Sequence, residues 1–124
     1  MTTANNDLLG IDKIAHDDGS ISAILTINAD SEILKGHFPG HPVVPGACML
    51  QIVKEVLESV LGDTLRVKKA DQLKFMIMID PASTPAVQLD IAYQYAEDNV
   101  ISVTAKLSNP EAVYFKFLGS FEVQ

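Results

Sequence analysis

With 124 residues, 48% of them hydrophobic, and a formal net charge of −7, the chain has the size and composition of one folded domain spanning residues 1–124. The acidic balance argues against nucleic-acid binding, and no apolar run approaches the ~20 residues of a membrane-spanning helix. Residues 1–7 lack the basic and apolar regions of a signal peptide, and Cys48 is the one cysteine, so we expect a cytoplasmic protein without an internal disulfide.

Two strands are expected before residue 30. Residues 20–28 alternate apolar and polar side chains, which is typical of a strand with one buried face. A shorter strand near residues 8–15 is expected to pair with it. The connection contains His16 beside two aspartates and a glycine, so we expect this histidine to be a solvated turn residue.

Residues 47–61 predict the one long helix. Their apolar side chains recur at the three- and four-residue spacing of a helix face, and Gly62 can end the helix in the left-handed conformation. We expect Cys48 to be a small buried side chain rather than a nucleophile. The opposite, polar face of the helix carries Gln51, Lys54, Glu55 and Glu58.

The remaining strands follow this helix. Residues 71–79 alternate, and residues 86–121 contain two further alternating segments, 86–95 and 100–107, separated by turn residues, so they predict an antiparallel meander. We expect Met49, Met76 and Met78 in the core or lining a tunnel. The fold class is therefore α+β, with an antiparallel sheet of about six strands wrapped around one central helix.

Residues 36–46 form the motif that contains the candidate catalytic residues. They read Gly-His-Phe-Pro-Gly-His-Pro-Val-Val-Pro-Gly, and three prolines with three glycines in eleven residues predict a rigid loop that enters the long helix. A histidine in such a loop can act as a general base, and the free N–H groups of the helix N-terminus suit a developing oxyanion. Pro39 and Gly40 break any helical spacing between His37 and His41, so we expect no metal site.

This motif resembles the signature of the 3-hydroxyacyl-(acyl carrier protein) dehydratases of the FabZ/FabA type, and Leu73-Lys74-Phe75 followed by Pro81 resembles a later strand of that family. The resemblance implies a hot-dog fold and the dehydration of a (3R)-3-hydroxyacyl thioester to the trans-2-enoyl thioester, with no metal or organic cofactor. It implies that His37 removes the C2 proton and that Gly46 binds the thioester carbonyl through its backbone N–H. It also places Phe38 at the substrate and suggests a cis peptide bond before it.

Gln51 departs from the family, which has an acidic residue at this position. An amide donates hydrogen bonds but cannot act as an acid at neutral pH. Three interpretations stay open: a water or His37 itself carries the proton, Glu55 one turn later replaces the missing acid, or the chain binds or hydrolyses acyl thioesters without dehydrating them.

The resemblance also implies partners. The substrate would arrive on an acyl carrier protein, and two-fold dimers, in some members trimers of dimers, would share each active site between chains. Arg66, Lys68 and Lys69 form a candidate docking patch for an acidic carrier protein. Lys35 can belong to the same patch. The alternative function is a hot-dog thioesterase or acyl-thioester-binding protein.

Overall fold

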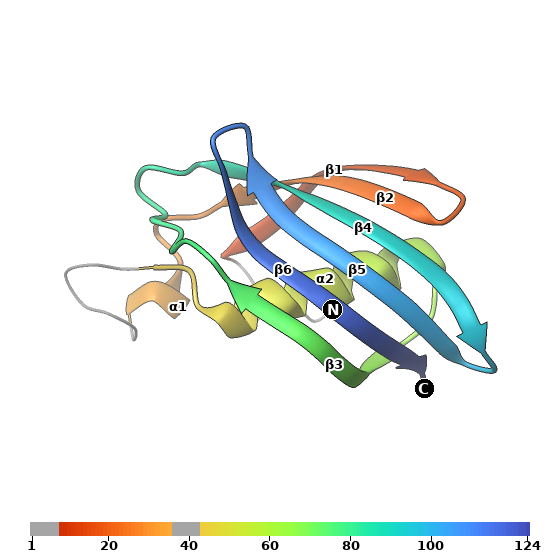
Figure 1. The fold of residues 1–124 in the computed structure, drawn as a ribbon. Coiled ribbons are helices and arrows are strands. Elements are labelled where there is room, and N and C mark those ends of the chain that lie inside the picture. Colours follow the sequence, from red (N-terminus) through yellow and green to blue (C-terminus); the bar gives the residue numbers. More distant parts are fainter. Residues whose placement is uncertain (1–7, 36–42) are drawn as a thin grey trace.

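One long helix lies against the inner face of a six-stranded antiparallel sheet in the computed structural model, which describes residues 8–35 and 43–124 (Figure 1). The strands follow the spatial order β1-β2-β4-β5-β6-β3. This arrangement confirms the predicted α+β architecture. The elements are β1 (Leu9–Asp17), β2 (Ser20–Ile27), α1 (Glu32–Lys35), α2 (Gly46–Leu61), β3 (Leu65–Phe75), β4 (Ala86–Glu97), β5 (Val100–Asn109) and β6 (Ala112–Val123).

Strand β3 differs from the prediction at both ends. It begins six residues before residue 71 and ends at Phe75 instead of residue 79. Two register shifts interrupt its pairing with β6, between Val67 and Lys69 and between Ala70 and Gln72. Each bulge adds a residue and breaks the alternation of faces, so the first half of the strand lacks the period-two pattern. The short helix α1 was not predicted either, and His16 lies in β1 rather than in a turn.

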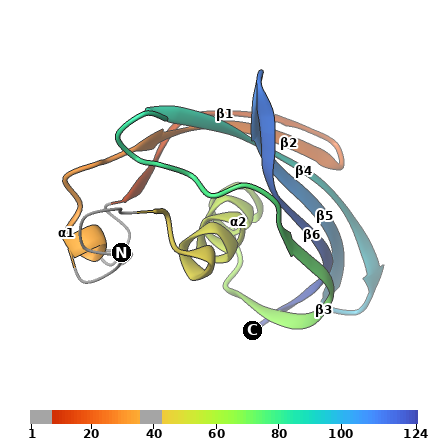
Figure 2. The same cartoon turned by 60° about the vertical axis from the view of Figure 1, so that its left-hand side comes forward.

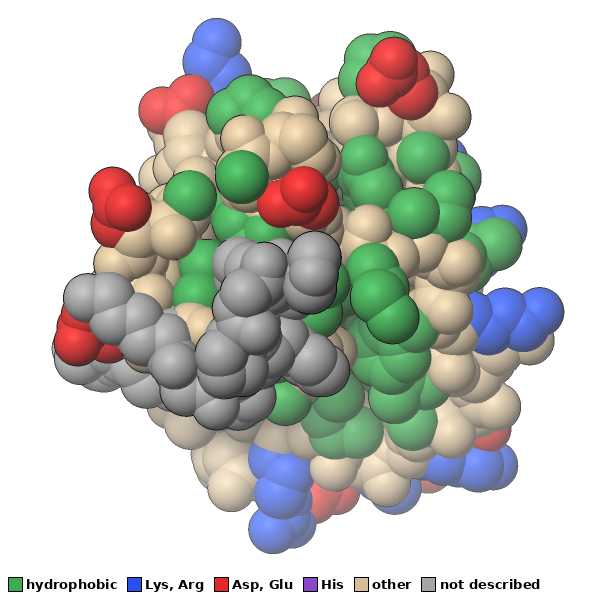
Figure 3. Space-filling model, turned by 90° about the vertical axis from the view of Figure 1, so that its left-hand side faces the viewer, with side chains coloured by type: hydrophobic (Ala, Val, Ile, Leu, Met, Phe, Trp, Pro, Cys, Tyr) green, Lys and Arg blue, Asp and Glu red, His purple; other side chains and the backbone are tan. Residues whose placement is uncertain are grey.

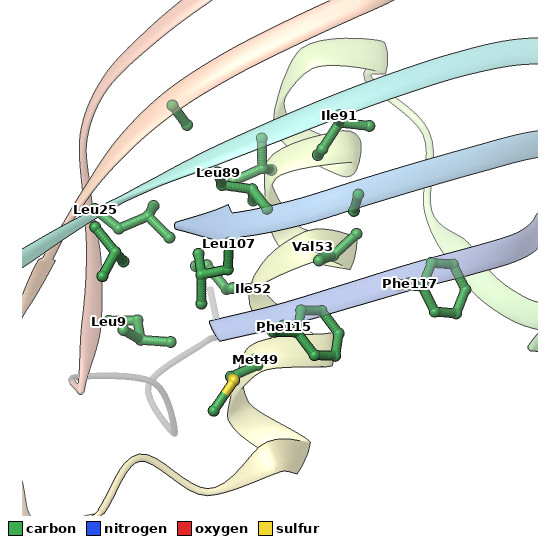
Figure 4. Close-up of a cluster of buried hydrophobic side chains, with 14 of the residues drawn as sticks. Leu9, Leu25, Met49, Ile52, Val53, Leu89, Ile91, Leu107, Phe115 and Phe117 are labelled. Atoms are coloured by element: carbon green, nitrogen blue, oxygen red, sulfur yellow. The ribbon is translucent and has the colours of Figure 1, made fainter. Parts of the chain in front are cut away.

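The core fills the space between α2 and the inner face of the sheet. The sheet curls around the helix (Figure 2), and apolar side chains from both meet in one cluster (Figure 4). The helix contributes its predicted apolar face, and β4, β5 and β6 contribute alternate residues. The buried side chains of α2 are Met49, Ile52, Val53, Val56 and Leu57.

The C-terminus of α2 is closed by hydrogen bonds. Gly62 adopts the predicted left-handed conformation, with φ of 80°, and its N–H donates to the carbonyl of Glu58 at 2.9 Å. The carboxylate Oε2 of Glu58 accepts the N–H of Leu65 at 2.8 Å, which joins the helix to the start of β3. Within residues 8–35 and 43–124, we find no helix whose length and apolar content would let it cross a membrane.

Candidate active site

The N-terminus of α2 is assembled from two segments that are far apart in the sequence. Pro45 precedes the helix in extended conformation, and the N–H of Val44 donates to the carbonyl of Ile79 at 3.0 Å. A Cβ atom on Gly46 would lie 2.7 Å from two carbons of the Phe75 ring. A side chain at Gly46 would therefore displace this ring, which covers the first turn of the helix.

The same helix end presents backbone donors. Among residues 8–35 and 43–124 no side chain caps it, and the first backbone hydrogen bond here runs from Cys48 to the carbonyl of Pro45. The N–H groups of Gly46 and Ala47 therefore have no acceptor within the helix. These N–H groups lie at the positive end of the helix dipole. The first turn also contains no acidic side chain that would compete for them. This geometry suits the binding of a developing oxyanion.

Gln51 and Glu55 meet on the polar face of α2. The Nε2 of Gln51 donates to Oε2 of Glu55 at 3.0 Å, and both side chains are half-buried. The bond occupies one of the two N–H groups of the amide. Among the described residues the second N–H and the carbonyl Oε1 have no further partner and can meet a ligand. The structure thus brings together two predicted site residues.

Cys48 lies one turn before this pair and is half-buried against the core. Burial raises the pKa of its thiol, and the negative charge of Glu55 raises it further. Both effects favour the protonated thiol. Cys48 is half-buried instead of buried as predicted, and its expected lack of a nucleophilic role stays a prediction.

Three predicted residues of the loop, His37, Phe38 and His41, lie outside the described residues, as does the predicted cis bond before Phe38. In the described part of the chain, no group of three or more His, Cys, Asp or Glu side chains has the arrangement of a metal site.

The candidate docking residues on β3 are partly neutralised by acidic neighbours. Arg66 forms an ion pair with Glu122 on β6, and the hydrogen bond from Arg66 lowers the pKa of the Glu122 carboxyl. Lys69 pairs with Asp71 at 3.2 Å, while Lys68 is exposed. Lys35 ends α1, and its side chain is outside the described residues.

Several apolar side chains near the N-terminus of α2 are exposed and are not part of the core. Met49 is buried as expected, but Met76 and Met78 are 51% and 76% exposed, so the prediction of a core position is wrong for them. Strand β3 ends at Phe75, although the N–H of Met76 still donates to the carbonyl of Tyr114 on β6 at 2.8 Å. A broad group of hydrophobic side chains is visible on this end of the molecule (Figure 3). The exposed hydrophobic side chains between residues 73 and 78 are Leu73, Phe75, Met76, Ile77 and Met78.

The sequence missed two contacts that build this end, Phe75 against Gly46 and Val44 with Ile79. Both join segments about thirty residues apart in the sequence, so they depend on tertiary structure. The Lys74-Phe75 pair was the only local signal for the first of them.

Residues 13–116 match the model of the ApeI-like family, described as ApeI dehydratase. A FabZ 3-hydroxyacyl-[acyl-carrier-protein] dehydratase from Rickettsia bellii is 26% identical over 117 residues, which cover 86% of this chain and 81% of that protein. The chain spans about half the length of other curated FabZ relatives, 49% of that from Roseobacter denitrificans, for example.

Solved structures support the hot-dog fold. The dehydratase heterocomplex ApeI:P from Xenorhabdus doucetiae superimposes with a TM-score of 0.73 at 14% identity, covering 90% of this chain and 96% of that one. A thioesterase from Haemophilus influenzae gives a TM-score of 0.67 at 13% identity, covering 99% and 84%. Since dehydratases and thioesterases share this fold, the fold by itself does not choose between the two reactions.

Proposed function

The chain belongs to the ApeI-like dehydratase family, and on this basis we propose that it dehydrates (3R)-3-hydroxyacyl thioesters to trans-2-enoyl thioesters. The main support for the proposal is the N-terminus of α2 at Gly46, where no described side chain forms a cap. Phe75 covers this end of the helix, and Gln51 follows about one turn later. This arrangement combines a site for the thioester oxygen with a polar group on the same helix. The acyl carrier protein is the proposed bearer of the substrate.

In the proposed reaction, His37 takes the proton from C2 while the N–H of Gly46 stabilises the negative charge on the thioester oxygen. The C2–H electron pair forms the C2–C3 double bond as the C3–O bond breaks. The leaving hydroxyl needs a proton, which the Gln51 amide cannot supply. We assign its delivery to the protonated His37, so that water leaves and the histidine returns to its neutral form.

Gln51 positions the 3-hydroxyl in this scheme. Its amide is held by Glu55 at 3.0 Å, and the free N–H and Oε1 can hold the hydroxyl in line for protonation. Glu55 thus acts through Gln51 and is a positioning residue. Glu55→Gln is expected to lower kcat less than Gln51→Ala, whereas a larger loss from Glu55→Gln would identify Glu55 as the acid.

The proposed assembly is a two-fold dimer joined at β3. This strand is an edge of the sheet, and the apolar segment 73–78 beside it is exposed. Pairing of two β3 edges would cover both and would bring the site of one chain toward the other. Light scattering on Met78→Glu is expected to show monomers, while Tyr95→Glu, at another exposed apolar side chain, retains the dimer.

The decisive experiment measures hydration of a trans-2-enoyl thioester by the purified protein. His37→Ala is expected to lower the rate by ~10²–10⁴-fold, the usual contribution of a general base. His41→Ala in the same loop is the matched control and is expected to stay near the wild-type rate. A wild-type protein that hydrates no enoyl thioester would contradict the proposal.

A thioesterase is the second candidate, and Gln51 is the observation that favours it, because the acidic residue of the dehydratases is absent. Release of free thiol from acyl thioesters, measured in the same samples, separates the two reactions. Thiol release without hydration would establish the thioesterase. Gln51→Glu is expected to keep the fold and to raise dehydration, because it restores an acid of nearly the same volume.

A further inference from the structure

The hydrogen bond between Gln51 and Glu55 fixes which way the Gln51 amide faces. A carboxylate has no hydrogen to donate, so the group that lies 3.0 Å from Oε2 of Glu55 is the amide nitrogen Nε2. An amide turned over would bring its carbonyl oxygen against the carboxylate oxygen. The carbonyl Oε1 of Gln51 is therefore held away from Glu55.

The other charged side chains on the polar face of α2 have partners of their own. Lys54 pairs with Glu58 at 3.5 Å, and Glu58 also accepts the N–H of Leu65. Within residues 8–35 and 43–124, Glu55 is the one side chain that forms a hydrogen bond with Gln51. The two carboxylates of the helix thus differ, since Glu58 joins the helix to β3 and Glu55 orients an amide.

The negative charge of Glu55 also acts on the start of the helix. Burial, and after it this charge, raises the pKa of the Cys48 thiol, which lies about two turns earlier. Cys48, Gln51 and Glu55 are all half-buried, so their charges are less screened than in open water. A ligand that meets this part of the helix is better tolerated with a neutral hydrogen-bonding group than with an anionic one.

The Gln51 amide is within reach of a ligand that is bound at Gly46. The two positions are separated by ~7.5 Å along the helix axis, at a rise of ~1.5 Å per residue. Side chains of a helix lean toward its N-terminus, which shortens this gap. A thioester whose oxygen meets the N–H of Gly46 can therefore bring the substituent on C3 of its acyl chain to Gln51.

We infer that Gln51, oriented by Glu55, selects acyl thioesters with a hydroxyl at C3 over those with a 3-oxo group or with no polar group at C3. A hydroxyl donates its hydrogen to Oε1 and can accept the second N–H of the amide. A ketone oxygen can only accept, so it would leave Oε1 without a donor. The acyl thioester as ligand rests on the proposed function, whereas the direction of the amide follows from its bond to Glu55.

The test measures binding without turnover. Calorimetry compares three pantetheine amides of one chain length, which carry a (3R)-3-hydroxyl, a 3-oxo group or no substituent at C3. The amide linkage prevents thiol release and makes the C2 proton much less acidic than in a thioester. Wild type is expected to bind the 3-hydroxyacyl amide about tenfold more tightly than either of the other two, the contribution of one hydrogen bond.

Two variants separate the roles of Glu55 and Gln51. Glu55→Gln is expected to reduce the preference for the 3-hydroxyl to about threefold or less, because a second amide can donate as well as accept and no longer fixes Gln51. Gln51→Leu, which has neither donor nor acceptor, is expected to lose the preference. Glu58→Gln is the matched control, since it removes the same charge about one turn later and should keep the full preference. Urea midpoints show whether each variant is folded.

Equal affinities of wild type for the three amides, or no binding of any of them, would overturn the inference. An unchanged preference in Glu55→Gln, or an equal loss in Glu58→Gln, would also overturn it, because Glu55 would then not orient the amide. The proposed function is judged separately, by hydration of the enoyl thioester. A protein that hydrates nothing but still prefers the 3-hydroxyl would refute the dehydratase and support this inference, while hydration with equal affinities would do the reverse.

Discussion

The two ends of α2 are completed in opposite ways. At the C-terminus, Gly62 turns the chain and Glu58 accepts the first N–H of β3, so the helix end is closed by its own neighbours. At the N-terminus no side chain of the described residues caps the helix, and the ring of Phe75 lies over Gly46. The C-terminal end of α2 therefore contributes to the stability of the fold, while the N-terminal end keeps backbone N–H donors available for a ligand. Substitutions at the two ends are therefore expected to affect different measurements.

Gly46→Ala is expected to have the largest effect, on activity. The new Cβ would lie 2.7 Å from the Phe75 ring, which must move. The ring is half exposed and can shift, so we expect kcat/KM to fall ~10–100-fold while stability changes by less than about 1 kcal/mol. The double variant Gly46→Ala/Phe75→Leu relieves the contact and should recover part of the rate. Unchanged activity in Gly46→Ala would remove this helix end from the mechanism.

Gly62→Ala is expected to affect stability alone. Its φ of 80° is unfavourable for any residue with a Cβ, although the surrounding space is open. The cost is about 1–2 kcal/mol, measured as a lower midpoint in urea. Gly62→Asn, which tolerates this conformation better, should lose less. A fall in kcat/KM for Gly62→Ala would show that the C-terminal end is coupled to catalysis.

Glu58→Ala tests the hydrogen bond that closes the C-terminal end. Removing the carboxylate leaves the N–H of Leu65 without its acceptor, which costs about 1–2 kcal/mol. Lys54→Ala breaks only the ion pair with Glu58 and should cost less than about 0.5 kcal/mol. Denaturation curves of both variants measure the difference. Equal losses would assign the effect to the ion pair instead of the backbone hydrogen bond.

The smallest effect is expected on the reactivity of the Cys48 thiol, near the N-terminus of α2. Its raised pKa means less thiolate at a given pH, so alkylation at pH 8 should be slower than for an unstructured cysteine. Glu55→Gln removes the negative charge that helps to raise the pKa of the Cys48 thiol. The pKa should therefore fall, and alkylation should become a few-fold faster. Gln51→Ala leaves the Glu55 charge in place and serves as the control. The rate of iodoacetamide reaction as a function of pH gives the readout, and an unchanged profile in Glu55→Gln would exclude the charge effect.

Local patterns predicted most of this fold from the sequence. The helix 46–61 and the strands after residue 86 were readable because the spacing of their apolar residues matches their secondary structure. Strand β3 was placed too late because its two bulges interrupt that spacing. The bond between Gln51 and Glu55 follows from their positions one turn apart, whereas Phe75 against Gly46 depends on tertiary structure. The role of His37 stays a prediction.

The position of β3 in the sheet has a consequence for how the chain folds. Residues 65–75 pair only with residues 112–123 among the described strands, so β3 remains unpaired until β6 has formed. Such a non-local pairing slows folding, because a long loop must close first. On the ribosome, the apolar segment 73–78 is synthesised well before β6 and stays exposed while the nascent chain grows. The same residues that suit an interface in the folded protein are thus expected to be an aggregation hazard during synthesis.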